Sequence, residues 1–265
     1  SLLWIEFDLS VVAALLTQLE QSQWWPAAAI ETAQMRQLQV LIDHARRHSR
    51  FYAERLAGFR PDQMPGLREC LSAIPLMHRT DLQSRRAEID CAWLPPEHGE
   101  LSLAKSTGST GEPVSVKRSE LNRLVWMAMT LREHLWQRRD FSLSLAVIRA
   151  QLAEGNNARS GVSQTDWGPP VNHLFVTGPS HGLNLQTDVV RQAEWLRRIT
   201  PAYLLTYPNN LAALLDLAEG DPASRAGLAC LKQARTIGET LHDTLRERCR
   251  QLLGVEIADI YSTQE

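Results

Sequence analysis

The stretch AKSTGSTGEPVSVKRSELN, residues 104–122, gathers hydroxyl side chains and two glycines ahead of a proline. Gly108 and Gly111 can adopt backbone conformations that other residues avoid, which lets successive N–H groups converge on an anion. Pro113 restrains the exit of the segment, and Ser119 can cap an amphipathic helix that follows. This predicted order of strand, loop and helix is typical of phosphate-binding loops and favours an α/β fold. A flexible Ser/Gly linker is the weaker alternative.

Two sharper motifs do not fit the same stretch. A Walker-type loop needs Lys after its last glycine, and Glu112 stands there instead. A nucleophile elbow needs the pattern G-x-S-x-G, whereas this stretch has GSTG. The sequence therefore supports neither a P-loop kinase nor an α/β-hydrolase.

Composition limits the classes of protein to consider. The 265 residues are 44% hydrophobic, which is enough to bury a substantial core in one large domain or two smaller ones. The net charge of -2 predicts that neither nucleic acid nor a membrane is a partner. No apolar run is long enough to span a bilayer, and the four cysteines lack metal-site or disulfide spacing. We expect a cytoplasmic protein with reduced thiols.

The chain changes character near residue 95. Residues 1–95 are predicted to form a helical segment, with one long helix over 31–56 and a capping box at Thr80 and Gln83. Residues 96–265 are predicted to form an α/β portion of one continuous structural domain, because short strand-like runs alternate with helical ones. Strands are predicted in GELSLAKS, LSLAVIR, VNHLFVT, AYLLTY, LKQARTIG and VEIADIY, with helices near 187–199, 208–219 and 240–253.

Other conspicuous residues have plainer explanations. His44 and His48 are one helical turn apart, but Ala45 stands where a zincin would have Glu, so a solvated helix face is the better interpretation. Residues 153–170 lack apolar periodicity and are expected to form an exposed connection between strands. Residues 180–182, Ser-His-Gly, are interpreted as a polar turn.

Three motifs, in order, resemble those of a known enzyme superfamily. STGSTGEP, residues 106–113, is similar to the Ser/Thr/Gly-rich phosphate loop of the adenylate-forming (ANL) superfamily. IGETL at 237–241 resembles the Gly-Glu segment that lines the adenine pocket, and DIYSTQE at 259–265 resembles the later Tyr-to-Glu segment. The lead-in segments HARRHSRFYAERL and IPLMHRTDL resemble the phenylacetate-CoA ligase branch, which includes coenzyme F390 synthetase-like and CapK-like proteins.

This resemblance implies a fold and a reaction. The fold would be the large N-terminal domain of an adenylate-forming enzyme, with layered α/β sheets and a helical lead-in. A small carboxylic acid, for which aromatic acids are one candidate class, would attack the α-phosphate of ATP to give acyl-AMP and pyrophosphate. CoA or another thiol would then capture the acyl group. ATP and Mg²⁺ are the implied cofactors, and CoA is the implied co-substrate.

The resemblance also implies roles for individual residues. The loop residues that would hold the β- and γ-phosphates of ATP are Ser106, Thr107, Gly108, Ser109, Thr110 and Gly111. Gly238 and Glu239 would form part of the adenine pocket, and Tyr261 would stack on the adenine ring. Glu265 would coordinate Mg²⁺, because a hard cation prefers carboxylate oxygen.

Several positions depart from the family pattern or are assigned by place alone. Ser262 stands where the family usually has Gly, within the nucleotide-binding segment. Gln264 replaces the usual Ser or Thr that contacts the α-phosphate, although its amide can still donate a hydrogen bond. Gln264 and Glu265 are the candidate catalytic residues. The residues that fall where the family builds its acid pocket are Trp167, His173, Tyr207 and Pro208.

Two functional hypotheses follow. The first is an acid-thiol ligase that forms AMP, active in a full-length form. The sequence ends at Glu265, before the ribose-binding Asp, the hinge and the small C-terminal domain that the resemblance implies, so this segment alone is expected to be severely impaired in catalysis. The second is a degenerate, non-catalytic module that binds nucleotide or acts as a scaffold. Adenylyl transfer to a cofactor is a variant of the first that differs only in its acceptor.

Overall fold

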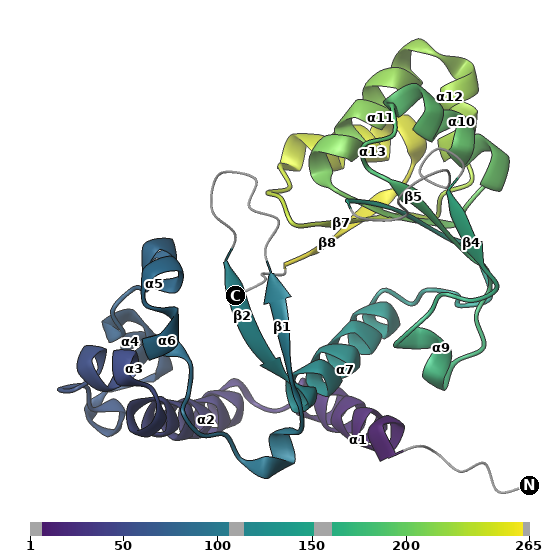
Figure 1. The fold of residues 1–265 in the computed structure, drawn as a ribbon. Helices are drawn as coiled ribbons and strands as arrows, with labels where there is room; N and C mark the ends of the chain where they lie inside the picture. Colours follow the sequence, from purple (N-terminus) through teal and green to yellow (C-terminus); the bar gives the residue numbers. More distant parts are fainter. Residues whose placement is uncertain (1–6, 106–113, 151–160, 262–265) are drawn as a thin grey trace, which may run out of the picture. The chain divides into compact units, whose positions relative to one another are not determined.

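The computed structural model describes residues 7–105, 114–150 and 161–261, and the chain divides into two compact units between residues 132 and 133. Figure 1 shows the elements of each unit. Within these described ranges, no helix combines the length and the apolar character that crossing a bilayer requires.

The first unit is a series of helices followed by one hairpin. Its α-helices are α1 (Phe7–Ser22), α2 (Ala27–His48), α3 (Arg50–Arg55), α4 (Leu67–Ala73), α5 (Arg79–Ser84) and α6 (Arg86–Ile89), with 3-10 turns at Pro61–Gln63 and Pro96–His98. Strands β1 (Leu101–Lys105) and β2 (Ser115–Ser119) then pair antiparallel. Helix α7 (Glu120–Trp136) follows β2 and crosses the boundary between the units.

The long helix predicted over 31–56 is two helices, because Ser49 interrupts it. Ser49 has an extended backbone with φ of −124°, and its hydroxyl accepts a 3.4 Å hydrogen bond from the Tyr52 N–H. The same hydroxyl donates a 2.9 Å hydrogen bond to the carbonyl of Glu88. A serine that bonds to the backbone in this way offers an alternative to the helical ladder, so α2 ends and α3 begins here.

The capping box predicted at Thr80 and Gln83 is wrong, although the helix exists. Helix α5 begins at Arg79, and the carboxylate of Asp81 accepts a 2.9 Å hydrogen bond from the N–H of His78. An ionised carboxylate is a stronger acceptor than the amide of Gln83. The reciprocal bond therefore forms earlier in the chain than the sequence pattern indicates.

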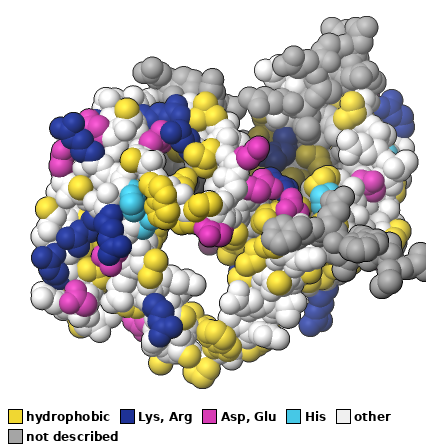
Figure 2. Space-filling model, turned by 60° about the horizontal axis from the view of Figure 1, so that its bottom comes forward, with side chains coloured by type: hydrophobic (Ala, Val, Ile, Leu, Met, Phe, Trp, Pro, Cys, Tyr) yellow, Lys and Arg dark blue, Asp and Glu magenta, His cyan; other side chains and the backbone are white. Residues whose placement is uncertain are grey.

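Several large apolar side chains of the first unit are exposed to solvent. The exposed fraction is 82% for Trp24, 80% for Leu76 and 66% for Val40. Figure 2 shows hydrophobic side chains at the surface, interspersed with charged ones. Scattered apolar residues of this kind are ordinary at protein surfaces, so we assign them no function.

The second unit is built on a six-stranded sheet. Its strands are β3 (Leu145–Arg149), β4 (Val162–Gln164), β5 (Ser180–Asn184), β6 (Tyr203–Thr206), β7 (Gln233–Ile237) and β8 (Glu256–Ile260), in the spatial order β4-β5-β3-β6-β7-β8. All neighbouring pairs are parallel except β4 with β5. Parallel strands joined by helices confirm the predicted α/β class.

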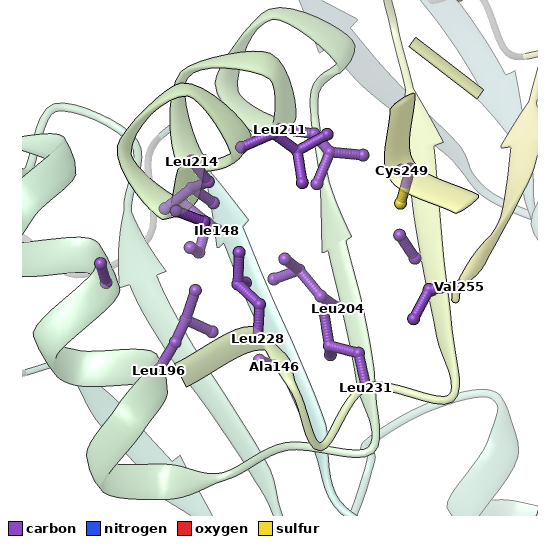
Figure 3. Close-up of a cluster of buried hydrophobic side chains, with 14 of the residues drawn as sticks. Ala146, Ile148, Leu196, Leu204, Leu211, Leu214, Leu228, Leu231, Cys249 and Val255 are labelled. Carbon is purple, nitrogen blue, oxygen red and sulfur yellow. The ribbon is translucent and has the colours of Figure 1, made fainter. Parts of the chain in front are cut away.

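Four helices cover one face of this sheet (Figure 1). They are α10 (Val189–Ile199), α11 (Pro208–Gly220), α12 (Pro222–Leu228) and α13 (Asp243–Leu253). Alternate residues of the strands, such as Ile148 and Leu204, meet Leu211 and Leu214 of α11 in one buried cluster (Figure 3). Burying one such side chain contributes about 1.5–3 kcal/mol, so this cluster supplies much of the cohesion of the unit.

Five of the predicted strand segments are confirmed, and VNHLFVT is wrong. The short helix α9 (Val171–Leu174) forms there instead. The N–H of Asn172 donates to the carbonyl of Gly168 at 3.1 Å, and its side-chain amide donates to Asp166 at 3.1 Å. These local hydrogen bonds favour a helical turn over a strand.

Two further sequence interpretations are corrected by the sheet. The Ser-His-Gly segment at 180–182 belongs to β5 and is not a turn, because its backbone pairs with β3 on one side and β4 on the other. The predicted connection at 153–170 includes β4, although residues 151–160 lie outside the described ranges. Neither strand has the apolar alternation that would reveal it in the sequence.

Candidate functional site

The strand order of the second unit marks one edge of the sheet as the place for a ligand. From β3 the chain goes first to β5 on one side and then to β6 on the other, so the direction of winding reverses between β3 and β6. In open parallel sheets, ligands bind outside the carboxyl ends of the strands at such a switch point. We call this side, where β3, β5, β6, β7 and β8 end, the carboxyl edge.

Tyr207 and Gly238 meet at the carboxyl edge. Tyr207 directly follows β6, and Gly238 directly follows β7. Gly238 has a φ of +79°, and a Cβ added to it would lie 3.3 Å from Cε1 of the Tyr207 ring. Two features therefore favour glycine over other residues at this position: the left-handed backbone and the close approach of the Tyr207 ring. The result is a close contact in which the Tyr207 ring packs against the backbone of Gly238.

Glu239 closes the amino end of helix α11. Its carboxylate accepts a 3.0 Å hydrogen bond from the N–H of Asn209, in the first turn of the helix, and the buried Pro208 has no N–H to offer. The negative carboxylate thus takes the position that the helix dipole would otherwise offer to an anion. This part of the edge suits an uncharged group better than a phosphate.

Tyr261 follows β8 at the same edge. Ile260 pairs with Ile237 in the ladder, so Tyr261 and Gly238 follow neighbouring positions on adjacent strands. The Tyr261 side chain is 93% exposed. Gly238, Glu239 and Tyr261, which were predicted to contact adenine, are therefore brought to one edge by β7 and β8.

A network of hydrogen-bonded amide side chains lies next to this edge, on the side of α10 and α11. The Asn210 amide donates to the Thr206 hydroxyl and to the Gln192 carbonyl oxygen, each at 2.9 Å. The Gln192 amide in turn donates to the backbone carbonyl of Thr187 at 2.8 Å. Because buried polar groups are costly unless they are paired, this network ties α11 to α10 and to the segment after β5.

The four residues predicted for the acid pocket do not line one pocket. Tyr207 and Pro208 lie at the carboxyl edge, but Trp167 and His173 lie at the opposite edge, where the parallel strands begin. The Trp167 indole donates to the carbonyl of Leu143 at 2.8 Å, just before β3. The prediction of a shared pocket is therefore wrong. Trp167 and His173 precede β5 in the chain and lie where that strand begins, whereas Tyr207 directly follows the end of β6.

Trp167 is a packing residue. It is 8% exposed, and its ring lies against Phe141, Tyr203 and His134, with ring centroids 5.5–5.6 Å apart. His173 is exposed beside a shallow hollow of about 400 Å³ that Asn172, Phe175 and Thr177 help to line. His173 and Trp167 therefore occupy different surroundings at this edge.

The remaining predicted site residues lie outside the described residues. They are the loop residues 106–111 with Ser262, Gln264 and Glu265. The described strands nevertheless show what the loop connects, because Lys105 of β1 pairs with Ser115 of β2. The predicted order of strand, loop and helix is therefore wrong: the loop closes an antiparallel hairpin, and β2 separates it from α7.

Ser119 caps helix α7 as predicted. Its hydroxyl accepts a 3.2 Å hydrogen bond from the N–H of Asn122. Since β2 intervenes, the amino end of α7 does not directly follow the segment that was predicted to bind phosphate.

The two histidines of α2 pack against a tryptophan. The ring centroids of His44 and His48 are 4.7 Å apart, and Trp93 lies 5.1 Å from His48. Both histidines are half-buried, so the interpretation as a solvated helix face is corrected. Within the described part of the chain, no group of three or more His, Cys, Asp or Glu side chains could hold a metal ion.

A buried charge network lies on the face of the sheet opposite the four helices. Glu133 at the end of α7 accepts two hydrogen bonds from Arg139, at 2.6 and 2.7 Å, and one from Arg235 of β7 at 2.8 Å. Burial raises the pKa of Glu133, but the hydrogen bonds and charges of Arg139 and Arg235 outweigh it and hold the pKa below its usual value. The carboxylate is therefore ionised at neutral pH.

No pattern in the sequence predicts this network. Its members come from α7, the segment after it and β7, and no motif spacing connects them. One signal was present, because Arg149 ends the strand LAVIR and Arg235 lies in the middle of the strand QARTI. A charge in a buried strand indicates a partner or a ligand.

The fold of this chain is shared with about half of a solved CoA ligase. Among solved structures, the chain is similar to 2-hydroxyisobutyryl-CoA ligase in complex with 2-HIB-AMP and CoA in the thioesterification state, with a TM-score of 0.62 and 20% identity. The alignment covers 90% of this chain and 50% of that chain. The postadenylation state with 2-HIB-AMP gives a TM-score of 0.61 and 21% identity, with the same coverage of 90% and 50%.

The chain thus spans about half the length of that ligase, as the 50% coverage states, and shares its fold over this half. This likeness confirms the predicted fold class and the resemblance to the adenylate-forming superfamily at the level of fold. No family model and no curated protein matches the sequence.

Proposed function

We propose that the chain is the nucleotide-binding part of an enzyme that activates a small carboxylic acid as an acyl-adenylate and transfers the acyl group to CoA or another thiol. The observation that supports this most directly is the meeting of Tyr207, Gly238 and Glu239 at the carboxyl edge. The structure of 2-hydroxyisobutyryl-CoA ligase in the thioesterification state, which shares the fold, contains 2-HIB-AMP and CoA. The motifs extend the proposal to the phenylacetate-CoA ligase and CapK-like branch.

The carboxyl edge suggests how a nucleotide would bind. The adenine ring would lie against the backbone at Gly238, with the exposed Tyr261 ring available to stack on it. Glu239 at the start of α11 would repel phosphate, so the phosphates would point away from that helix. Their proposed binding site is the loop 106–111, through its backbone N–H groups and hydroxyls.

The resemblance suggests one protein ligand for Mg²⁺. We propose Glu265 together with phosphate oxygens, because hard cations prefer oxygen ligands. A bound Mg²⁺ would offset negative charge on the phosphates. The carboxylate of Glu265 suits a hard cation of this kind.

The residues of the chain would act mainly by position and charge. The Gln264 amide would donate a hydrogen bond to the α-phosphate as negative charge develops there, which is the form of electrostatic assistance that lowers such barriers. The carboxylate of the acid would displace pyrophosphate, and a thiolate would then displace AMP from the acyl group. For the acid pocket, Tyr207 and Pro208 remain candidates, since both lie at the carboxyl edge.

Pyrophosphate exchange tests this proposal. The protein that contains this chain is incubated with ATP, labelled pyrophosphate and a panel of aliphatic and aromatic acids, and exchange that depends on one acid is expected. Added hydroxylamine should trap the same acyl-adenylate as a hydroxamate. If AMP binds but no acid in the panel supports exchange or hydroxamate, the ligase proposal fails.

A non-catalytic nucleotide-binding module is the second candidate. The observation that favours it is the replacement of the usual Ser or Thr by Gln264. Calorimetry of the chain with AMP and ATP separates the candidates, because this one requires binding without turnover. Binding of neither nucleotide would leave only a scaffold.

A further inference from the structure

The face of the sheet opposite the four helices carries more positive than negative charge. Arg139 and Glu133 form a complete pair there, because the two carboxylate oxygens each accept a hydrogen bond from the guanidinium. The third donor of Arg139, Nε, bonds to the Gln233 side-chain oxygen at 2.8 Å. This pair is neutral as a whole, so any other arginine on this face needs a different counter-charge.

Arg235 has only a share of that pair. Its side chain is 6% exposed, and one nitrogen, Nη2, donates to Glu133 Oε2 at 2.8 Å. Its Nε is buried and has no hydrogen-bond partner among the described residues. Burial lowers the pKa of Arg235 to about 10, and the positive charge of Arg139 adds to the effect. The charge of Arg235 is therefore poorly compensated.

Arg149 stands on the same face, nearer the carboxyl edge. Val147, Leu205 and Arg235 form one row across β3, β6 and β7. Arg149 is two residues beyond Val147 at the end of β3, so it lies on the same face as Arg235, with the two Cα atoms about 12 Å apart. Its side chain is half-buried and, unlike its backbone carbonyl, which accepts a hydrogen bond from the Leu185 N–H, forms no hydrogen bond or ion pair with a described residue.

Among the described residues, Arg149 has no counter-charge and Arg235 only shares Glu133 with Arg139. Guanidinium groups that are buried or half-buried with so little compensation are energetically unfavourable unless an anion joins them. Nearby carboxylates could compensate these charges. Among the described groups, however, Glu133 is the one acid that affects the pKa of Arg235, and Glu133 is already paired with Arg139. Guanidinium groups bind oxyanions with paired N–H donors, and their side chains are long enough to converge over this distance.

We propose that Arg149 and Arg235 together bind an oxyanion, a carboxylate or a phosphate of the ligand, on the sheet face beside the carboxyl edge. Arg149 supplies donors at the rim that no described residue uses, and Arg235 supplies fixed positive charge behind it. The identity of the ligand rests on the proposed function, but the anion site itself rests on the charges and burial described above. Neither residue belongs to the motifs that carry the resemblance.

The proposal is tested by direct observation of the arginine side chains. The chain is labelled with ¹⁵N, and the Nε–H signals are followed by NMR while sodium acetate, inorganic phosphate, AMP or adenosine is added. The Arg235 and Arg149 signals are identified by their loss in Arg235→Gln and Arg149→Gln. At least one oxyanion is expected to shift both signals, and each variant should weaken its binding about tenfold or more.

Arg191→Gln is the matched control, because Arg191 is exposed on α10 in the same unit. Its affinity for every probe should equal that of the unmodified chain. Arg149→Gln serves as the second variant in case Arg235→Gln disturbs folding, since Arg149 makes no described hydrogen bond that its loss would break. Circular dichroism of both variants checks that the fold is retained.

The pattern of probes identifies the source of the oxyanion. Acetate binding without phosphate binding assigns the site to a carboxylate, whereas AMP binding much more tightly than adenosine assigns it to the nucleotide phosphate. Suppose that AMP binds, but that Arg149→Gln changes neither the affinity for acetate nor the ratio of the AMP affinity to the adenosine affinity. The anion site is then overturned, while the proposed function stands. If no probe shifts either arginine signal, the anion site is also overturned.

Discussion

Glu133 holds Arg139 in a bidentate ion pair with distances of 2.6 and 2.7 Å, and the Arg139 side chain is 1% exposed. The pair ties the end of α7 to the segment that leads into β3. Since Arg235 of β7 bonds to the same carboxylate, one side chain joins three parts of the chain.

Replacing Glu133 by Gln should destabilise the second unit strongly. The change leaves two buried arginines without their carboxylate, and breaking a buried pair in this way costs about 3–5 kcal/mol. Urea unfolding measures the loss, with Glu194→Gln on the exposed side of α10 as the control. A loss below about 1 kcal/mol, the scale of exposed ion pairs, would contradict a structural role for the pair.

The stability from Glu133 should also depend on acid pH. Its pKa is held below the usual value in the folded protein, so its contribution is present above the unfolded pKa of about 4.3 and is lost as pH falls through the folded pKa. Unfolding free energies measured downward from about pH 5 should therefore fall more steeply in the unmodified chain than in Glu133→Gln. Parallel curves would show that the carboxylate is not held ionised.

His134 should lower stability in mild acid. Burial, with the charges of Arg235 and Arg139, lowers the pKa of His134 to about 2, and its Nδ1 accepts a hydrogen bond from Arg139 at 3.2 Å. The unfolded chain takes up this proton near pH 6.5 and the folded chain does not. Stability is therefore fully present above about pH 6.5 and falls below it by up to about 1.4 kcal/mol per pH unit.

His134→Gln should reduce this dependence on pH. Unfolding by urea is compared between about pH 7.5 and about pH 5.5, a range that brackets the histidine pKa in unfolded chains. His173→Gln is the control, because that side chain is exposed. Equal slopes for all three proteins would mean that His134 is protonated in the folded state.

Gly238→Ala should weaken both the fold and nucleotide binding. A side chain at a φ of +79° costs about 1–2 kcal/mol, and the new Cβ would press on the Tyr207 ring at 3.3 Å. Gly220→Ala at the end of α11 is the matched control, because no atom lies within 4 Å of the added Cβ. Urea unfolding and AMP calorimetry report the two effects. An unchanged AMP affinity would remove Gly238 from the proposed adenine site.

Tyr261→Ala should affect binding without affecting stability. The side chain is 93% exposed, so the free energy of unfolding should change by less than about 0.5 kcal/mol. Loss of ring stacking on adenine should cost about 1–3 kcal/mol in AMP affinity, whereas Tyr261→Phe should retain it. If Tyr261→Ala binds AMP as tightly as the unmodified chain, the ring does not stack on the base.

Local chemistry explains which parts of the fold could be predicted. LAVIR and YLLT are short, mostly apolar runs, QARTI mixes polar and apolar residues, and Gly254, with a φ of +68°, ends α13 as its position indicates. β5 could not be predicted in this way, because Ser180, His181 and Gly182 have polar or small side chains and form a strand through backbone pairing with their neighbours. VNHLFVT failed for the opposite reason, since local hydrogen bonds to Asp166 and Gly168 overrode an apolar pattern.

By itself, the sequence determined the α/β class, most of the parallel strands and the glycine and glutamate that follow β7. These features depend on residues close together in the chain, where turn chemistry and apolar periodicity act directly. Only the tertiary structure decided that Trp167 and Tyr207 lie at opposite edges of one sheet. It alone also decided that Glu133 meets Arg235, 102 residues away, because charge pairing across a sheet depends on strand order and register, which no local pattern records.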